Sequence, residues 1–242
     1  MTDDRPNVLD YARFEALTFD TYGTLIDWET GILGGLRPVL ARAGVPESVA
    51  PDEVLLEAFA AAEARIEAGP YRRYRDVLAE VFDEVAGRWG VAPTADERAR
   101  FGGSVVDWPA FPDSAEALDR LASRFRLGVI TNCDDDLFAA SARRLGEPFT
   151  WVVTAQQLGS YKPAERNFEL ALDRIGLPRE LVLHVAQSLF HDHVPAQRLG
   201  FSSVWIDRRR GRDGGGATAP AGDVEVDAAF PDMASFADAA LA

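Results

Sequence analysis

The sequence has few of the features that mark secreted or membrane-spanning proteins. Its single cysteine, Cys133, cannot form an internal disulfide, which is typical of a reducing compartment. No apolar stretch approaches the ~18 residues that a transmembrane helix needs. The first ten residues, MTDDRPNVLD, lack the basic and then apolar pattern of a signal peptide. We therefore expect a cytoplasmic protein that does not act on a membrane.

Positive charge is also scarce. The chain has 25 basic residues against 39 acidic ones, which gives a formal net charge of −14. Because contacts to nucleic-acid phosphates need clustered Lys and Arg, we expect no nucleic-acid partner. The 242 residues are 47% hydrophobic, which is enough for one large α/β domain or for a core with an inserted segment.

Apolar runs of strand length alternate with helical patterns in most of the chain. This alternation predicts a parallel sheet with helices on both faces, an α/β fold. The predicted strands are 14–19, 127–130, 151–154, 181–185 and 203–206, and the helices among them are 112–125, 137–145, 163–175 and 195–199. The Gly- and Pro-rich segment 208–222 reads as a mobile connection, although its basic start could contact an anion.

The first strand is followed by a long segment without a strand pattern. Helical periodicity covers 31–43, 51–68, 71–89 and 94–106, with acidic first turns and glycine stops marking the ends. We expect this inserted block, residues 28–109, to form a helical cap over the catalytic face of a core made of 1–27 and 110–242. Its aromatic side chains are expected mainly in the helix core, with Tyr71 and Tyr74 as candidates to line a pocket.

Polar residues stand where the predicted strands end. Asp20 follows the first strand, Thr131 follows the second, and Lys162 precedes a helix that starts with proline. Asp192 lies in the loop after the strand 181–185. Because open α/β sheets place their chemistry at the carboxyl ends of strands, we expect these four side chains to form one catalytic site.

With this set, in this order, the chain resembles the haloacid dehalogenase-like (HAD) hydrolase superfamily, and most closely its L-2-haloacid dehalogenase branch. The resemblance implies a Rossmann-like core with an inserted cap. It also implies a hydrolase that acts on a small-molecule substrate. Asp20 would be the nucleophile and would form an ester, Lys162 would hold it ionised, and Asp192 would help to position water. Thr131 would hydrogen-bond the substrate or Asp20.

Two positions favour the dehalogenase branch. HAD phosphatases usually carry a second aspartate two residues after the nucleophile, which protonates the leaving alkoxide, whereas this chain has Tyr22. A halide is a weak base and needs no such acid. Gln187 stands where a Mg²⁺-binding carboxylate is usual, and a neutral amide is a poor ligand for that ion. We therefore expect no metal and no other cofactor.

The resemblance also suggests residues around the substrate. Asn132 matches the asparagine that contacts the leaving halide. The expected halide-binding arginine has no match by spacing, because Pro51 falls near its place; Arg37 and Arg42 are candidates. The full set of expected substrate-binding residues is Tyr22, Thr24, Asn132, Gln187, Ser188 and Arg42.

Two rival functions stay open. One is a phosphatase that tolerates Tyr22 and Gln187 and binds Mg²⁺ through Asp20 and Asp192. The other is a catalytically silent HAD domain that binds a metabolite, although a pure binder need not retain all four motif residues. His184, His191 and His193 could suggest Zn²⁺, but the first lies in a predicted buried strand. The assembly state is open, with a homodimer as one alternative.

Overall fold

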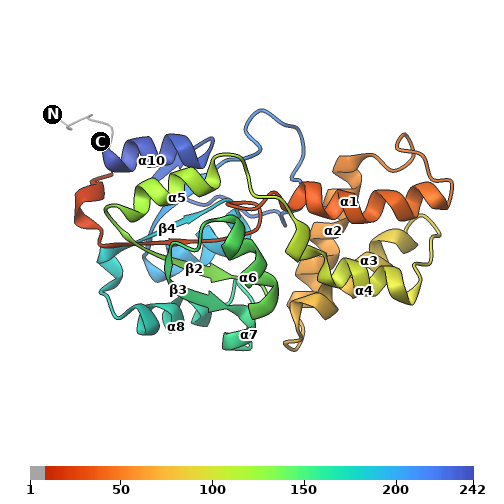
Figure 1. Ribbon diagram of the computed structural model, residues 1–242, viewed down its shortest axis with the longest axis horizontal. Coiled ribbons are helices and arrows are strands. Elements are labelled where there is room, and N and C mark those ends of the chain that lie inside the picture. The colour runs from red at the N-terminus through yellow and green to blue at the C-terminus, as the bar shows by residue number, and fades with distance from the viewer. Residues whose placement is uncertain (1–8) are drawn as a thin grey trace.

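A six-stranded sheet lies at one end of the molecule and a block of helices at the other (Figure 1). The computed structural model describes residues 9–242. All neighbouring strands are parallel, in the order β3-β2-β1-β4-β5-β6. The strands are β1 Ala16–Phe19, β2 Arg126–Thr131, β3 Phe149–Thr154, β4 Val182–Ala186, β5 Ser202–Ile206 and β6 Ala228–Phe230.

The central strand β1 sets the position of the site. All four of its residues are buried, as expected for a parallel strand covered on both faces. Phe19 is in register with Val129 of β2 on one side and Val185 of β4 on the other. The residues that follow these three strands therefore meet at one edge of the sheet.

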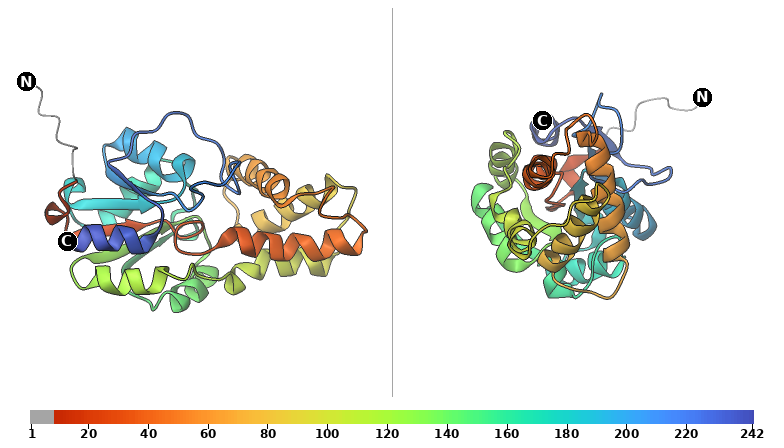
Figure 2. Two further views of the ribbon diagram at one scale, coloured as in Figure 1. Left: turned by 90° about the horizontal axis from the view of Figure 1, so that it is seen from above. Right: turned by 90° about the vertical axis from the view of Figure 1, so that its right-hand side faces the viewer.

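Helices cover both faces of the sheet (Figure 2). Apolar residues of α5, α6 and α10 pack in the larger core cluster, whereas those of α8 and α9 pack in a second cluster on other sheet residues. The predicted α/β architecture is confirmed. The core helices are α5 Ser114–Ala122, α6 Asp135–Arg144, α7 Ala155–Leu158, α8 Arg166–Ile175, α9 Val194–Leu199 and α10 Met233–Leu241, with short 3-10 turns at Tyr11–Arg13 and Arg179–Leu181 and a π-helix at Leu189–His193.

Residues 28–109 contain helices and no strand, as predicted, and we call them the cap. Aromatic rings hold the cap helices together, with Phe82 stacked on Phe101 at 4.5 Å and Trp28 edge-on to Phe59. Its division from the core as a separate domain stays a prediction. The helices are α1 Trp28–Arg42, α2 Asp52–Glu67, α3 Tyr74–Gly87 and α4 Ala95–Gly103, followed by a 3-10 turn at Ser104–Asp107.

Buried Asp134, after β2, ties the cap to the sheet. Its two carboxylate oxygens accept hydrogen bonds from the backbone amides of Tyr74 (3.0 Å) and Arg75 (3.2 Å) at the start of α3. A carboxylate at this place satisfies free amides and complements the positive end of the helix dipole. The cap is thus anchored next to the carboxyl edge of the sheet.

The segment 208–222 differs from its prediction as a mobile connection. Arg208 donates to Asp113 at 2.9 Å and to the Thr24 carbonyl at 2.9 Å. Arg209 forms ion pairs with two cap carboxylates, Glu29 at 2.7 Å and Glu53 at 2.5 Å. Its basic start therefore fixes the loop against both the core and the cap, which Figure 2 shows as the loop that reaches from the sheet to the cap helices.

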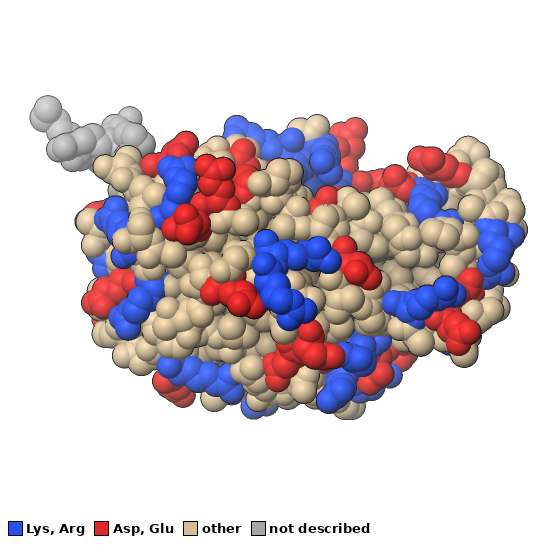
Figure 3. Space-filling model, in the orientation of Figure 1, with Lys and Arg blue, Asp and Glu red and all other residues tan. Residues whose placement is uncertain are grey.

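Besides the short 3-10 turns and the π-helix, three elements of the core were not predicted: α7, β6 and α10. On the face seen in Figure 3, basic side chains lie beside acidic ones, which agrees with exposed pairs such as Arg42–Glu97 and Arg120–Asp238. Among residues 9–242, no helix combines the length and apolar character that crossing a membrane requires.

Candidate active site

Asp20 lies in the first turn after β1 and is 6% exposed. Its Oδ2 accepts a hydrogen bond from Thr24 at 2.7 Å, and Thr24 in turn accepts one from the Gln187 backbone amide at 2.8 Å. Gly23, with φ of +89°, allows the chain to fold back between them. The turn therefore holds the carboxylate in one orientation at the sheet edge.

Lys162 neutralises this carboxylate. Its side chain is 1% exposed, and its Nζ donates to Asp20 Oδ1 at 2.8 Å, Asp192 Oδ1 at 2.7 Å and the Ile130 carbonyl at 2.8 Å. Burial favours the neutral amine, but the carboxylates of Asp192 and Asp20 outweigh it and raise the pKa of Lys162. All three ammonium hydrogens have acceptors, so the cation is fixed between the two acids.

Asp192 pairs with the same ammonium as Asp20 and is fully buried. His184, on β4, donates from Nε2 to Asp192 Oδ1 at 2.9 Å, and its Nδ1 pairs with the Thr18 hydroxyl at 3.0 Å. Although burial opposes ionisation, Lys162 and His184 lower the pKa of Asp192. Its second oxygen, Oδ2, has no hydrogen-bond partner and can receive a water or substrate donor.

Burial has the opposite net effect on Asp20. Desolvation raises the pKa of this carboxyl group above its usual value, with Lys162 opposing and Asp192 adding to the shift. The Thr131 hydroxyl, at the end of β2, is buried and has no partner. Since buried polar groups are normally paired, this hydroxyl is free to make one further hydrogen bond, although Thr131 lines neither of the two cavities beside Asp20.

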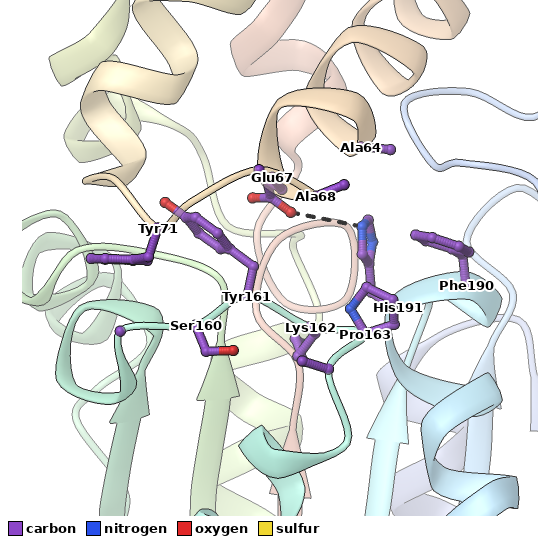
Figure 4. Close-up of a pocket in the computed structure, with 13 residues that line it drawn as sticks. Ala64, Glu67, Ala68, Tyr71, Ser160, Tyr161, Lys162, Pro163, Phe190 and His191 are labelled. Atoms are coloured by element: carbon purple, nitrogen blue, oxygen red, sulfur yellow. Dashed lines mark ion pairs between the residues drawn. The ribbon is translucent and has the colours of Figure 1, made fainter.

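Two cavities adjoin these residues. The inner one, of about 30 Å³, is lined by Asp20, Lys162 and Asp192 together with Tyr22, Trp28, Glu63, Glu67, Tyr74, Asn132, Ser188 and His191. It has room for one or two waters. The outer one, of about 360 Å³, includes Tyr71, Tyr161 and Phe190. Glu67, Lys162 and His191 line both cavities, and Figure 4 shows them among the residues of the outer one.

The cap contributes two acids to the inner cavity. Glu63 and Glu67 are one helical turn apart on α2, and the Tyr74 hydroxyl donates to Glu63 at 2.7 Å. Burial raises the pKa of Glu63 to about 7. The pKa of Glu67 lies well above its usual value, because it is buried and because Glu63 is close, with Lys162 and Asn132 opposing the shift. Burial therefore favours the protonated form of Glu67.

His191 faces Glu67 across the passage between the cavities. Its Nε2 lies 3.9 Å from Glu67 Oε2, and the dashed line in Figure 4 marks this pair. Burial lowers the pKa of His191 to about 4, so the imidazole is neutral where Glu67 is protonated. This separation exceeds hydrogen-bonding distance. Both His191 Nε2 and Glu67 Oε1 are buried without partners.

Three of the expected substrate-binding residues line the inner cavity: Tyr22, Asn132 and Ser188. The Tyr22 hydroxyl points away from it and donates to Cys133 at 3.2 Å, with the Ser141 hydroxyl at the same distance. Its burial raises the pKa of Tyr22 well above the usual value. Tyr22 thus offers its ring, and no acidic proton, to the cavity. The expected pocket lining by Tyr74 and Tyr71 is also found, in the inner and outer cavities respectively.

Two expected substrate-binding residues lie elsewhere. Gln187 gives only its backbone amide to the site. Its side-chain oxygen accepts from Thr218 in the C-terminal loop, which turns the amide away from Asp20. The prediction that Arg42 binds the substrate is wrong. Arg42 lies off the buried stripe of α1, is 54% exposed and pairs with Glu97 at 2.9 Å. Arg37 likewise pairs with Asp52. No arginine among residues 9–242 lines the inner cavity.

The donor set does not fit a resident Mg²⁺. The two acids that would be expected to hold such an ion, Asp20 and Asp192, each share one oxygen with the Lys162 ammonium. A second Asp20 oxygen is held by Thr24, and neither Tyr22 nor Gln187 supplies a carboxylate. Within the described part of the chain, no group of three or more His, Cys, Asp or Glu is arranged to hold a metal ion. The three histidines are separately engaged in hydrogen bonds.

Sequence reasoning missed Glu63 and Glu67, although a signal was present. Leu56 and Ala60 are buried and precede them on α2 at helical spacing, so the two acids continue a stripe that faces inward. A second missed signal is that Lys162 is the only lysine in the sequence, where the other basic residues are all arginine. An arginine could not replace a compact ammonium at this position.

Comparisons with known proteins show what the chain is similar to. A family model described as haloacid dehalogenase-like hydrolase matches residues 14–188. The chain is 24% identical over 197 residues to (S)-2-haloacid dehalogenase 4A of Burkholderia cepacia, covering 80% of this chain and 83% of the relative.

Solved structures show the same fold. A defluorinating L-2-haloacid dehalogenase aligns with a TM-score of 0.77 at 22% identity, covering 95% of this chain and 96% of the other. The L-2-haloacid dehalogenase of Xanthobacter autotrophicus with chloropropionic acid covalently bound aligns with a TM-score of 0.74 at 19% identity, covering 93% and 97%.

Proposed function

The chain belongs to the haloacid dehalogenase-like hydrolase family, and from that premise we propose that it cleaves the carbon–halogen bond of a small 2-haloacid through an ester on Asp20. The observation that carries the proposal is the pairing of Asp20 with Lys162 at 2.8 Å beside a small cavity. A carboxylate held in this way is suited to act as a nucleophile. Relatives with this fold are named for 2-haloacids.

Two displacement steps follow. An oxygen of Asp20 forms a bond to the halogen-bearing carbon, and the carbon–halogen electron pair leaves with the halide. Water then attacks the Asp20 carboxyl carbon and gives its oxygen to Asp20. One hydrogen completes the product hydroxyl, and one proton leaves to solvent. The unpaired Oδ2 of Asp192 is suited to position this water, and the unpaired Thr131 hydroxyl to bind the substrate.

The surroundings of Asp20 support a halide over a phosphate ester. Phosphate ester cleavage needs a proton for the alkoxide and a cation for the phosphoryl group. The hydroxyl at position 22 is engaged with Cys133 and Ser141, and the donor set around Asp20 does not fit Mg²⁺. We therefore propose that the enzyme uses no metal and no other cofactor.

Halide release from chloro-, bromo- and fluoroacetate, with and without EDTA, tests the proposal. We expect release that EDTA does not change, and its loss by several orders of magnitude in Asp20→Asn. Asp119→Asn, which removes an exposed carboxylate on α5, is the matched control and should keep full activity. Strict Mg²⁺ dependence with p-nitrophenyl phosphate as the better substrate would establish the phosphatase instead. No turnover of either substrate class would favour the silent binding domain.

A single turnover in ¹⁸O-water distinguishes the ester from direct attack by water. In the ester route, the product hydroxyl takes its oxygen from the carboxylate, so the first product is unlabelled and the label enters the Asp20 peptide. Labelled product without label in that peptide would show that Asp20 is only a general base.

A further inference from the structure

The leaving-group side of the inner cavity is occupied by an acid from the cap. Asn132, the residue expected to contact the halide, has two amide hydrogens, and both are engaged: one with Glu67 Oε2 at 3.1 Å and one with the Lys162 carbonyl at 3.0 Å. Its carbonyl oxygen accepts from the Lys162 amide. Asn132 thus positions Glu67 and has no free hydrogen for a halide.

Glu67 itself has a free oxygen at this place. Its side chain is 5% exposed, and Oε1 is buried without a partner while Oε2 is held by Asn132. The residue lines the cavity that contains Asp20. A buried, unpaired oxygen beside the nucleophile can act as a donor from the cap, provided that it carries a proton.

Resting on the proposed function, we propose that Glu67 in its protonated form donates a hydrogen bond from Oε1 to the departing halide, in the place of an arginine, and so makes fluoride a favoured leaving group. The Asp20–carbon bond forms, the carbon–halogen bond breaks, and its electron pair leaves on the halide. The Glu67 proton is shared with the halide and stays on Glu67, because halides are weak bases. No arginine lines the inner cavity within residues 9–242 to compete for this role.

Fluoride gains most from this arrangement. It is the smallest and most basic halide and accepts the strongest hydrogen bonds, whereas bromide leaves readily without a donor. A cavity of about 30 Å³ also suits the smallest halide. A charged arginine would attract every halide, but a neutral acid discriminates through hydrogen-bond strength. An ionised Glu67 would instead repel the anion, so the preference should be lost as pH rises.

Charged and titratable groups face Glu67 from each element packed around it. The raised pKa of Glu67 results from burial and from Glu63, with Lys162 and Asn132 opposing it. Removing the charge of Glu63 should therefore lower the pKa of Glu67 without removing its titration. The facing groups are Glu63 on α2, Tyr74 on α3, Asp20 after β1, Tyr161 and Lys162 before α8, and His191 and Asp192 in the π-helix.

Turnover of fluoroacetate and bromoacetate from pH 5.5 to 9.5 provides the first test. Glu67→Leu should lower fluoride release about 10- to 100-fold, the effect of losing a hydrogen bond to a charged group, and bromide release much less. Glu67→Gln keeps an N–H donor but cannot titrate, so it should retain turnover and lose the decline at alkaline pH. Glu63→Gln should move that decline to lower pH. Glu57→Gln, exposed on the same helix, is the matched control.

Fluoride binding followed by ¹⁹F line broadening provides a test that needs no turnover. If halide binding requires the Glu67 proton, the wild-type affinity should fall about tenfold per pH unit above the pKa of Glu67. The affinity of Glu67→Gln should not depend on pH in this way. A flat wild-type profile, an unchanged slope in Glu67→Gln, or no fluoride binding at pH 5.5 would overturn the assignment. These results are independent of Asp20→Asn, which tests the proposed function alone.

Discussion

Replacing Lys162 with methionine should destabilise the protein strongly and in a pH-dependent manner. The substitution keeps most of the apolar stem and removes the ammonium that lies 2.8 Å from Asp20 and 2.7 Å from Asp192. Breaking a buried ion pair by removing one partner costs about 3–5 kcal/mol, because the remaining charges are left uncompensated. For a chain of this size, that corresponds to a fall in Tm of about 6–20 °C.

The pH dependence follows from the direction of the pKa shifts. In the wild type the pKa of Asp192 is lowered in the folded state, so its stabilising effect is present above the ordinary carboxyl pKa and is lost as pH falls through the lowered value. Without Lys162, burial raises the pKa of both acids. Folding of the variant is then favoured by protonation of these acids. Its loss of unfolding free energy relative to the wild type should therefore be smaller at pH 5 than at pH 8.

Thermal unfolding of both proteins at pH 5 and pH 8 measures this difference. Arg120→Met is the matched control, since Arg120 is 39% exposed and pairs with the exposed Asp238. Such surface pairs contribute at most ~1 kcal/mol. Because the chain has no other lysine, ¹⁵N-lysine labelling also gives one side-chain signal to confirm the charged state. The reasoning would be refuted if Lys162→Met lost no more stability than Arg120→Met, or if its loss of stability were the same at pH 5 and pH 8.

Three further predictions concern single contacts. Arg209→Met should increase hydrogen exchange in the first turn of α1, because its 2.7 Å pair with Glu29 connects the loop to the cap; unchanged exchange would mean that the pair does not hold the cap. Arg42→Ala should change the rate of halide release less than about twofold, because its exposed pair with Glu97 lies away from both cavities. Thr131→Val should lower kcat/KM about tenfold with a Tm within a few degrees of wild type, since its buried hydroxyl has no protein partner to lose; kinetics and thermal unfolding together show whether the hydroxyl binds substrate.

The meeting of Asp20, Lys162 and Asp192 at one edge of the sheet could be predicted because parallel strands impose a geometry on the sequence. Asp20 and Asp192 follow neighbouring strands β1 and β4, and the carboxyl ends of those strands share one edge. A buried strand is a local pattern, and so is the polar residue that ends it. Lys162 meets them by the same rule, since the segment after β3 returns to this edge.

Side-chain directions outside the strands were not predictable in the same way. Gln187 turns toward Thr218, which is 31 positions further along the chain in a loop without periodicity. Glu67 enters the site only because α2 docks with one face toward the sheet edge, and that depends on contacts such as the one between Asp134 and the start of α3. The placement of the cap therefore decides which of its side chains meet the substrate. Tertiary packing, not local pattern, fixes that placement. The cytoplasmic location and the lack of a nucleic-acid partner stay predictions from composition.

The charge of the site limits which substrates it can bind. Lys162 is the one cation that lines the inner cavity within the described residues, and its three hydrogens are already shared among Asp20, Asp192 and a carbonyl. If Glu63 and Glu67 were both ionised, a haloacid anion would enter a cavity with four carboxylates and one ammonium. When Glu67 is protonated, three carboxylates remain in the cavity. Two of them, Asp20 and Asp192, are already paired with Lys162. The cap acids therefore make binding of an anionic substrate depend on their own protonation, so affinity for a haloacid should decline at alkaline pH even where Asp20 is fully ionised and ready to attack.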